Sequence, residues 1–258
     1  ANLLLARLYM EGKELPKNVG AAADHYNRAA LLGDIDATFR YADLLENSDV
    51  VDGDAAPWYR KAAEKGHVES QFRLARLLAD SKLSAQQDES KTWYRKAAEN
   101  GHVESQFRWA SLQDSGKAAP DSLQWYRKAA ENGHVESQFR LAQRLQDSGR
   151  DADLPEAVNW YRKAAMSGHP KAVMPLALLL ESGQGMKPAP EEALKWYAQA
   201  AKADDPEALF RLGRLHDQGL GARADSRQAL DYYARAAKLG HKEAAKLIDT
   251  LISLPPLD

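Results

Sequence analysis

The chain has 258 residues, a length that suits either one ordinary domain or an elongated array of repeats. Its formal net charge is only −2 at pH 7, which excludes a strong global field that would attract nucleic acid or an anionic membrane. Cysteine is absent, which excludes disulfides and cysteine-based zinc sites, and no apolar run approaches the ~20 residues of a membrane span or opens the chain as a signal peptide.

One phrase is written almost identically three times along the chain. The eighteen residues that begin Trp-Tyr-Arg-Lys-Ala-Ala stand at 58–75, 93–110 and 125–142. Equivalent positions recur at intervals in the thirties along the whole sequence and are occupied by His25, Trp58, Trp93, Trp125, Trp160, Trp196 and Tyr232. A period of this size predicts helical repeats that stack, because one hairpin cannot bury its own apolar face. We expect the tryptophans to be buried core anchors.

Each repeat is predicted to contain two helices. Residues 68–79 show the period of an amphipathic first helix, and residues 88–99 that of a second helix. No strand-like alternation is present, so the sequence predicts an all-α fold, a right-handed α-solenoid forming a single repeat domain over 1–258. The expected repeats are 1–33, 34–66, 67–101, 102–133, 134–168, 169–204 and 205–240, with a capping helix at 241–252.

Glycine and histidine mark the repeat boundaries. A glycine ends the second helix in six repeats, as expected of a left-handed residue after a helix, and the next residue is Asp34, His67, His102, His134, His169, Asp205 or His241. We interpret these residues as N-caps of the following helix. A metal site is the alternative, but one histidine per repeat places neighbours about 10 Å apart or more, whereas zinc needs its nitrogens within ~2 Å. We therefore expect no metal and no cofactor.

The pattern A-L-x-W-Y-x-x-A-A-x-x-G-H-x-E-A resembles the Sel1-like repeat, a relative of the tetratricopeptide repeat. The pairs Gly183/Gly185 and Gly219/Gly221 resemble the family's Gly-x-Gly turn, for which turn geometry is favoured over a phosphate cradle. The resemblance implies an adaptor for protein assembly, in many cases bacterial and in the envelope. Residues 3–16 and 21–37 are in addition similar to repeats of the periplasmic scaffold lipoproteins of alginate secretion, which implies a periplasmic role in exopolysaccharide export, with the cytoplasm as the alternative compartment.

The phenylalanines and the arginines that follow them are the candidate partner-binding residues. All five phenylalanines occupy the same position of the first helix, well away from the centre of its apolar arc, and the pairs are Phe39–Arg40, Phe72–Arg73, Phe107–Arg108, Phe139–Arg140 and Phe210–Arg211. One interpretation is that each phenylalanine packs on the neighbouring repeat. The other is that these pairs line the concave groove, because aromatic residues and arginine dominate interface hot spots. Glutamates four residues earlier are placed to neutralise most of these arginines.

Other patterns carry less chemistry. The basic pairs at 60–61, 95–96, 127–128 and 162–163 form a surface of mixed sign, in which each lysine of the first three is expected to pair with a glutamate three residues on. No nucleophile–base arrangement is present, so no catalytic residue is assigned and no enzyme is expected. The predicted function is a scaffold that binds other proteins. The alternative is a module that binds an anionic polysaccharide or an extended acidic ligand along the groove.

Overall fold

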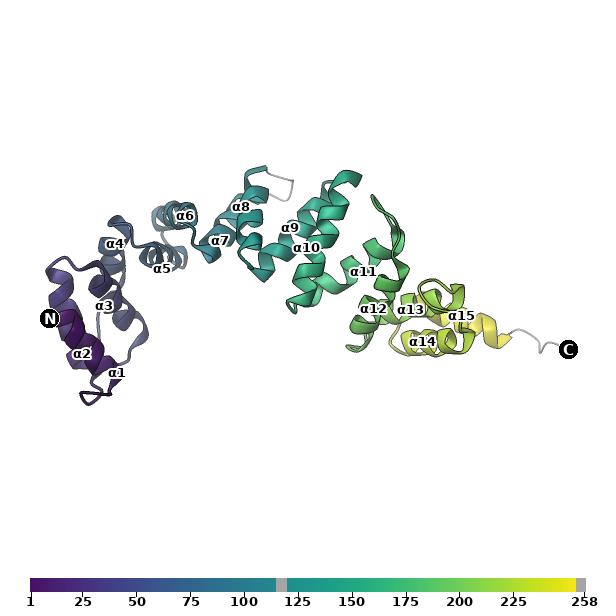
Figure 1. Cartoon of the computed structure of the whole chain (residues 1–258), viewed down its shortest axis with the longest axis horizontal. Helices are drawn as coiled ribbons and strands as arrows, with labels where there is room; N and C mark the ends of the chain where they lie inside the picture. Colours follow the sequence, from purple (N-terminus) through teal and green to yellow (C-terminus); the bar gives the residue numbers. More distant parts are fainter. Residues whose placement is uncertain (115–119, 254–258) are drawn as a thin grey trace. The chain divides into compact units, whose positions relative to one another are not determined.

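The computed structural model describes residues 1–114 and 120–253. Within these residues the chain forms fifteen α-helices and two short 3-10 helices, without a strand (Figure 1). The α-helices follow one another as seven helix-turn-helix repeats and a final single helix, which confirms the predicted all-α solenoid fold. None of the described helices is both long enough and apolar enough to cross a membrane.

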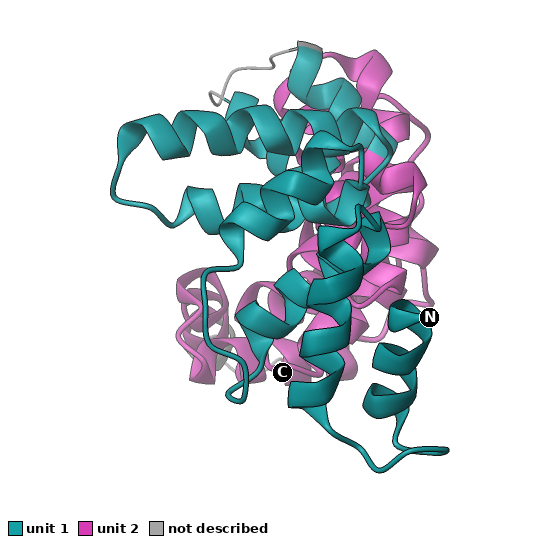
Figure 2. Cartoon of the chain, turned by 90° about the vertical axis from the view of Figure 1, so that its left-hand side faces the viewer, with its two compact units in different colours: residues 1–128 teal, residues 129–258 magenta. Residues whose placement is uncertain are grey.

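Residues 1–128 make up the first of two compact units, coloured teal in Figure 2. Each helix from α1 to α6 packs against the next helix in sequence. The α-helices that begin in this unit are α1 (Asn2–Glu11), α2 (Val19–Leu31), α3 (Ile35–Asn47), α4 (Ala56–Glu64), α5 (Val68–Ala79), α6 (Ser84–Glu99), α7 (Val103–Gln113) and α8 (Pro120–Glu131).

Residues 129–258 make up the second unit, coloured magenta in Figure 2. Its helices again pack in chain order, from α9 against α10 to α14 against α15. The helices that begin in this unit are α9 (Val135–Asp147), η1 (Asp151–Asp153), α10 (Leu154–Met166), η2 (Pro170–Ala172), α11 (Val173–Ser182), α12 (Pro190–Ala201), α13 (Pro206–Gln218), α14 (Ser226–Lys238) and α15 (Lys242–Ser253).

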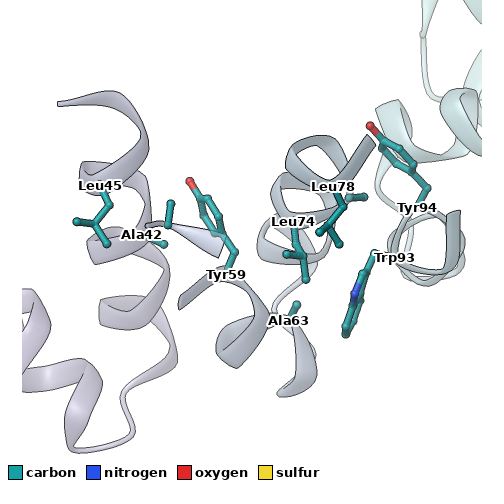
Figure 3. Close-up of a cluster of buried hydrophobic side chains, with 10 residues drawn as sticks. Ala42, Leu45, Tyr59, Ala63, Leu74, Leu78, Trp93 and Tyr94 are labelled. Carbon is teal, nitrogen blue, oxygen red and sulfur yellow. The ribbon is translucent and has the colours of Figure 1, made fainter. Parts of the chain in front are cut away.

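The core anchor of each repeat is a tyrosine rather than the tryptophan before it. Tyr59 is completely buried, and Figure 3 shows it between Ala42 of α3 and Leu74 of α5. Its hydroxyl donates a hydrogen bond of 2.7 Å to the Glu46 carboxylate. Tyr126, Tyr161 and Tyr197 are equally buried at the equivalent positions.

The expectation that the tryptophans are buried anchors holds only for some of them. Trp93 and Trp160 are buried, whereas Trp58, Trp125 and Trp196 are half-buried. The Lys128 ammonium lies over the Trp125 ring, 4.0 Å from its centroid. The indole thus lies at the margin of the core and is shielded by the stem and charge of a lysine.

The predicted Gly-x-Gly turns are structural. Gly185 has a φ of +68°, and a Cβ there would lie 2.3 Å from the carbonyl oxygen of Asp151 in the preceding repeat. Gly221 has a φ of +77°, and its Cβ would lie 2.5 Å from the carbonyl oxygen of Pro190. Only glycine fits both the left-handed conformation and the close backbone approach. These glycines therefore allow the turn of one repeat to pack on the backbone of the repeat before it.

Candidate functional site

Four of the five repeat histidines cap helices, as predicted. The Nδ1 atom of His67 accepts a hydrogen bond of 3.1 Å from the backbone N–H of Ser70, and His102 and His134 repeat this contact. His241 caps α15 in the same way. His169 differs because it precedes the 3-10 helix η2, and its side chain makes no capping bond. A ring whose Nδ1 accepts from the backbone keeps its proton on Nε2, so the second nitrogen points outward as a donor.

A glutamate in the preceding repeat forms a hydrogen bond with the Nε2 atom of the histidine. The Nε2 atom of His241 lies 3.0 Å from the Glu207 carboxylate, whose other oxygen accepts a bond of 2.6 Å from Arg211. His169 and Arg140 make the same two bonds to Glu136, at 3.0 and 2.8 Å. We call this Glu–Arg–His arrangement the junction clasp. It joins the first helix of one repeat to the start of the next.

The clasp shifts the titration of its glutamate. Burial raises the pKa of Glu136, but the hydrogen bonds from His169 and Arg140 and the positive charge of the arginine outweigh burial, so the pKa lies below its usual range. The pKa of Glu207 is lowered for the same reasons. Both carboxylates are therefore ionised at neutral pH, and the clasp is formed there.

At least four of the five phenylalanines of the candidate row contact the histidine of the next repeat. The rings of Phe139 and His169 lie 4.3 Å apart, with their planes at 17°, and Phe210 stacks on His241 in the same way. Phe39 and Phe72 also contact the next histidine. Phe107 lies 6.1 Å from the ring of Tyr126 in its own repeat. Phe139 and Phe210 are buried and the other three are half-buried.

The arginines extend further into solvent than the phenylalanines. Arg73, Arg108, Arg140 and Arg211 each donate from Nε to the glutamate four residues earlier, at 2.6–2.8 Å. Arg40 lies 3.7 Å from Asp36. In the first unit the row lies on α3, α5 and α7, and in the second unit on α9 and α13. The predicted neutralisation of these arginines within their own helix is thus confirmed, and about half of the Arg108 side chain remains exposed.

Two hollows in the second unit lie beside this row at equivalent repeat junctions. The first is a pocket of about 440 Å³, lined by Glu136, Phe139, Arg140, Gln143, His169, Pro170 and Lys171. The second is a pocket of about 290 Å³, lined by Glu207, Arg211, His241, Lys242 and Glu243. In each, the junction clasp forms one wall and the residues after the histidine form another. Both pockets are open to solvent, so an incoming side chain can reach the arginine from outside.

The basic pairs differ from their predicted role. Glu99 pairs with Arg95 at 2.8 Å, and not with Lys96 as expected. Lys96 instead lies over the Trp93 ring, 4.2 Å from its centroid. The arginines of two other pairs reach the next repeat, where Arg162 binds Glu192 through two bonds of 2.7 and 3.0 Å. Arg60 and Arg162 thus link neighbouring repeats, whereas Arg95 and Lys96 make their contacts within their own helix.

Comparison with known proteins places the repeats in a described family. The Sel1 repeat family model matches residues 1–34, 35–67, 68–102, 103–134, 135–169, 171–205 and 206–241. Among solved structures, the chain is similar to a protective antigen of uropathogenic Escherichia coli with an SLR fold, at 28% identity and a TM-score of 0.64, over 99% of this chain and 57% of that one. It is also similar to a Sel1 repeat protein from Oxalobacter formigenes, at 23% identity and a TM-score of 0.60, over 97% of this chain and 75% of that one. No curated protein matches.

Proposed function

The chain belongs to the Sel1-repeat family, and on that premise we propose that it is a non-enzymatic scaffold that binds other proteins at its repeat junctions. The chain spans 57% of the length of the Escherichia coli protein to which it is similar, so further segments and their activities lie outside this proposal. Repeat proteins of this kind mediate protein–protein interaction, because stacked hairpins present the same surface many times.

The observation that carries the proposal is the recurrence of a pocket beside Arg140 and beside Arg211. A partner that places one side chain into each of these two junctions meets a similar wall at both. Arginine beside an aromatic ring is typical of interface hot spots. Here the ring is held rigid by its histidine, and the guanidinium is oriented by its glutamate, so little side-chain entropy is lost on binding.

The charges of the pocket beside Arg140 indicate the chemistry of the partner. Arg140 and Lys171 contribute two positive charges, and Glu136 contributes one negative charge. An acidic or amide side chain of a partner protein suits this balance. An anionic polysaccharide is less suited to the row, because Arg73, Arg108, Arg140 and Arg211 each already bind a carboxylate of their own helix.

The finer proposal concerns the compartment. The similarity of residues 3–16 and 21–37 to periplasmic scaffold lipoproteins favours an envelope complex, such as one that exports an alginate-like exopolysaccharide. Fractionation of cells that express the tagged full-length protein tests this placement. Recovery with the envelope proteins supports it, and recovery only with the cytosol contradicts it.

A charge reversal tests the binding proposal. We expect Arg140→Glu to reduce the recovery of partner proteins at least tenfold, because it replaces the attractive charge of the pocket with a repulsive one. The control is Lys187→Glu, which makes the same charge change at an exposed position in the α11–α12 turn. Pull-down from an extract of the source cells, quantified by mass spectrometry, gives the readout. Equal recovery by both folded variants would show that the Arg140 pocket is not the interface.

A further inference from the structure

A separate pocket of about 220 Å³ lies in the first unit among residues of α6, α7 and α8. None of its lining residues belongs to the phenylalanine–arginine row. They are Arg95, Glu99, Trp109, Gln113, Asp121, Gln124 and Trp125. The volume lies below the ~300–1,000 Å³ of drug-sized sites and suits one small ring.

Other junctions show what normally fills this position. Glu192 lies between two donors, accepting 2.7 and 3.0 Å bonds from Arg162 of the repeat before it and a 3.2 Å bond from the indole N–H of Trp196. Glu89 is likewise bound by Arg60 and by the Trp93 indole. A single carboxylate therefore closes the space between neighbouring second helices.

At the junction with the pocket, the equivalent carboxylate does not make this contact. Asp121 occupies the position of Glu89 and Glu192, and its side chain is one methylene shorter. Arg95 instead donates from Nε to the Glu99 carboxylate of its own helix, at 2.8 Å. The Trp125 indole N–H has no acceptor among the described residues, and Asp121 has no hydrogen-bond or ion-pair partner there. The pocket is the space that this missing contact leaves open.

Two further residues make the pocket a site for a polar ring. Trp109 stands where Leu74 and Leu141 are completely buried in the neighbouring repeats, and it remains half-buried at the pocket wall. The Gln113 amide nitrogen is buried and has no hydrogen-bond partner in the described part of the chain. An unpaired buried donor is costly, so a ligand that accepts from it gains affinity.

We propose that this pocket binds one neutral sugar ring of a glycan. A ring hydroxyl both donates and accepts, so it satisfies the Asp121 carboxylate together with the Trp125 and Gln113 donors. The apolar face of a sugar packs on an indole, which Trp109 supplies. Among the described residues that line the pocket, the charges are one cation, Arg95, and two anions, Glu99 and Asp121, and this balance disfavours an acidic sugar. A basic side chain of a partner would leave the indole and amide donors unpaired.

Two variants should close the pocket by introducing the residues that stand at the equivalent positions of other repeats. Asp121→Glu introduces the residue that Glu89 provides at the earlier junction, where it binds Arg60 and Trp93. Trp109→Leu introduces the leucine that is buried in the flanking repeats. Both changes use residues that the same fold already accommodates, so we expect the variants to fold and Asp121→Glu to raise the Tm. Arg140→Glu, on another helix, is the control that keeps the sugar site intact. It also separates this proposal from the binding of proteins.

The probes are glucose, galactose, mannose and N-acetylglucosamine, with glucuronate as the acidic counterpart. Ligand-detected NMR and tryptophan fluorescence should show at least one neutral sugar binding in about the millimolar range, at least tenfold more weakly to Asp121→Glu and Trp109→Leu. Arg140→Glu should bind like the wild type. The proposal is overturned if no neutral sugar binds, if glucuronate binds more tightly than glucose, or if Asp121→Glu leaves affinity unchanged.

Discussion

Truncation of Phe139 separates a structural role of the phenylalanine row from a purely binding one. The ring is only 8% exposed, stacks on His169 at 4.3 Å and approaches Tyr161 at 5.9 Å. Phe139→Ala removes a buried aromatic side chain, which costs about 3–5 kcal/mol of unfolding free energy. That range includes stacking contacts worth about 0.5–1.5 kcal/mol per pair. We therefore expect a loss of about 4 kcal/mol.

Urea unfolding followed by far-UV circular dichroism measures this loss, with the slope compared between variants to verify that the same surface is exposed. Phe139→Leu is the matched control, because it keeps most of the buried volume and loses only the stack, for about 1–1.5 kcal/mol. A loss below about 1 kcal/mol for Phe139→Ala would refute the packing argument. The ring would then be free to serve a partner alone.

Three further outcomes follow from the geometry. The folded-state pKa of Glu136 lies below its unfolded value. The stability that its ionised carboxylate adds is therefore present above pH ~4.3 and is lost as the pH falls through the folded pKa. The Tm of Glu136→Gln should thus fall less between pH 6 and pH 3 than the Tm of the wild type. Gly185→Ala should cost about 2–3 kcal/mol in denaturant unfolding, since its Cβ meets the Asp151 carbonyl at 2.3 Å; an unchanged midpoint contradicts this. Asp204→Gly should raise stability by about 0.5 kcal/mol, because Asp204 has a φ of +54°; a lower Tm contradicts it.

The repeat pattern predicts the fold and the helix caps, with the exception of His169, which precedes a 3-10 helix and makes no capping bond. Each intrahelical relation can be derived from sequence spacing, such as Glu69–Arg73 or the cap that His67 provides for Ser70. These contacts depend on local geometry alone. The seven consecutive Sel1 repeats then indicate that each hairpin stacks on the next one in the sequence.

Of the contacts between repeats, the sequence predicts only the packing of the phenylalanines on the neighbouring repeat, as one of two interpretations. The polar contacts were not predicted, because they depend on how one hairpin stacks on the next. The bond from His169 to Glu136 joins residues 33 positions apart. The only sequence signal was that both residues recur in the same phrase. Phe139 lies away from the centre of the apolar arc of its own helix, yet the packing interpretation holds for it, because a helix inside a stack is covered on two sides. The pocket at Asp121 was overlooked because its origin is one missing methylene.

Site-specific photo-crosslinking tests most directly whether proteins bind at the repeat junctions. A photoreactive amino acid at Gln143, in the wall of the Arg140 pocket, is compared with the same group at Lys187 in the α11–α12 turn. We predict that irradiation in the source cells joins the Gln143 variant to a discrete protein, and that adding Arg140→Glu abolishes the product. Equal crosslinking from Lys187, or a product that survives Arg140→Glu, would contradict the account.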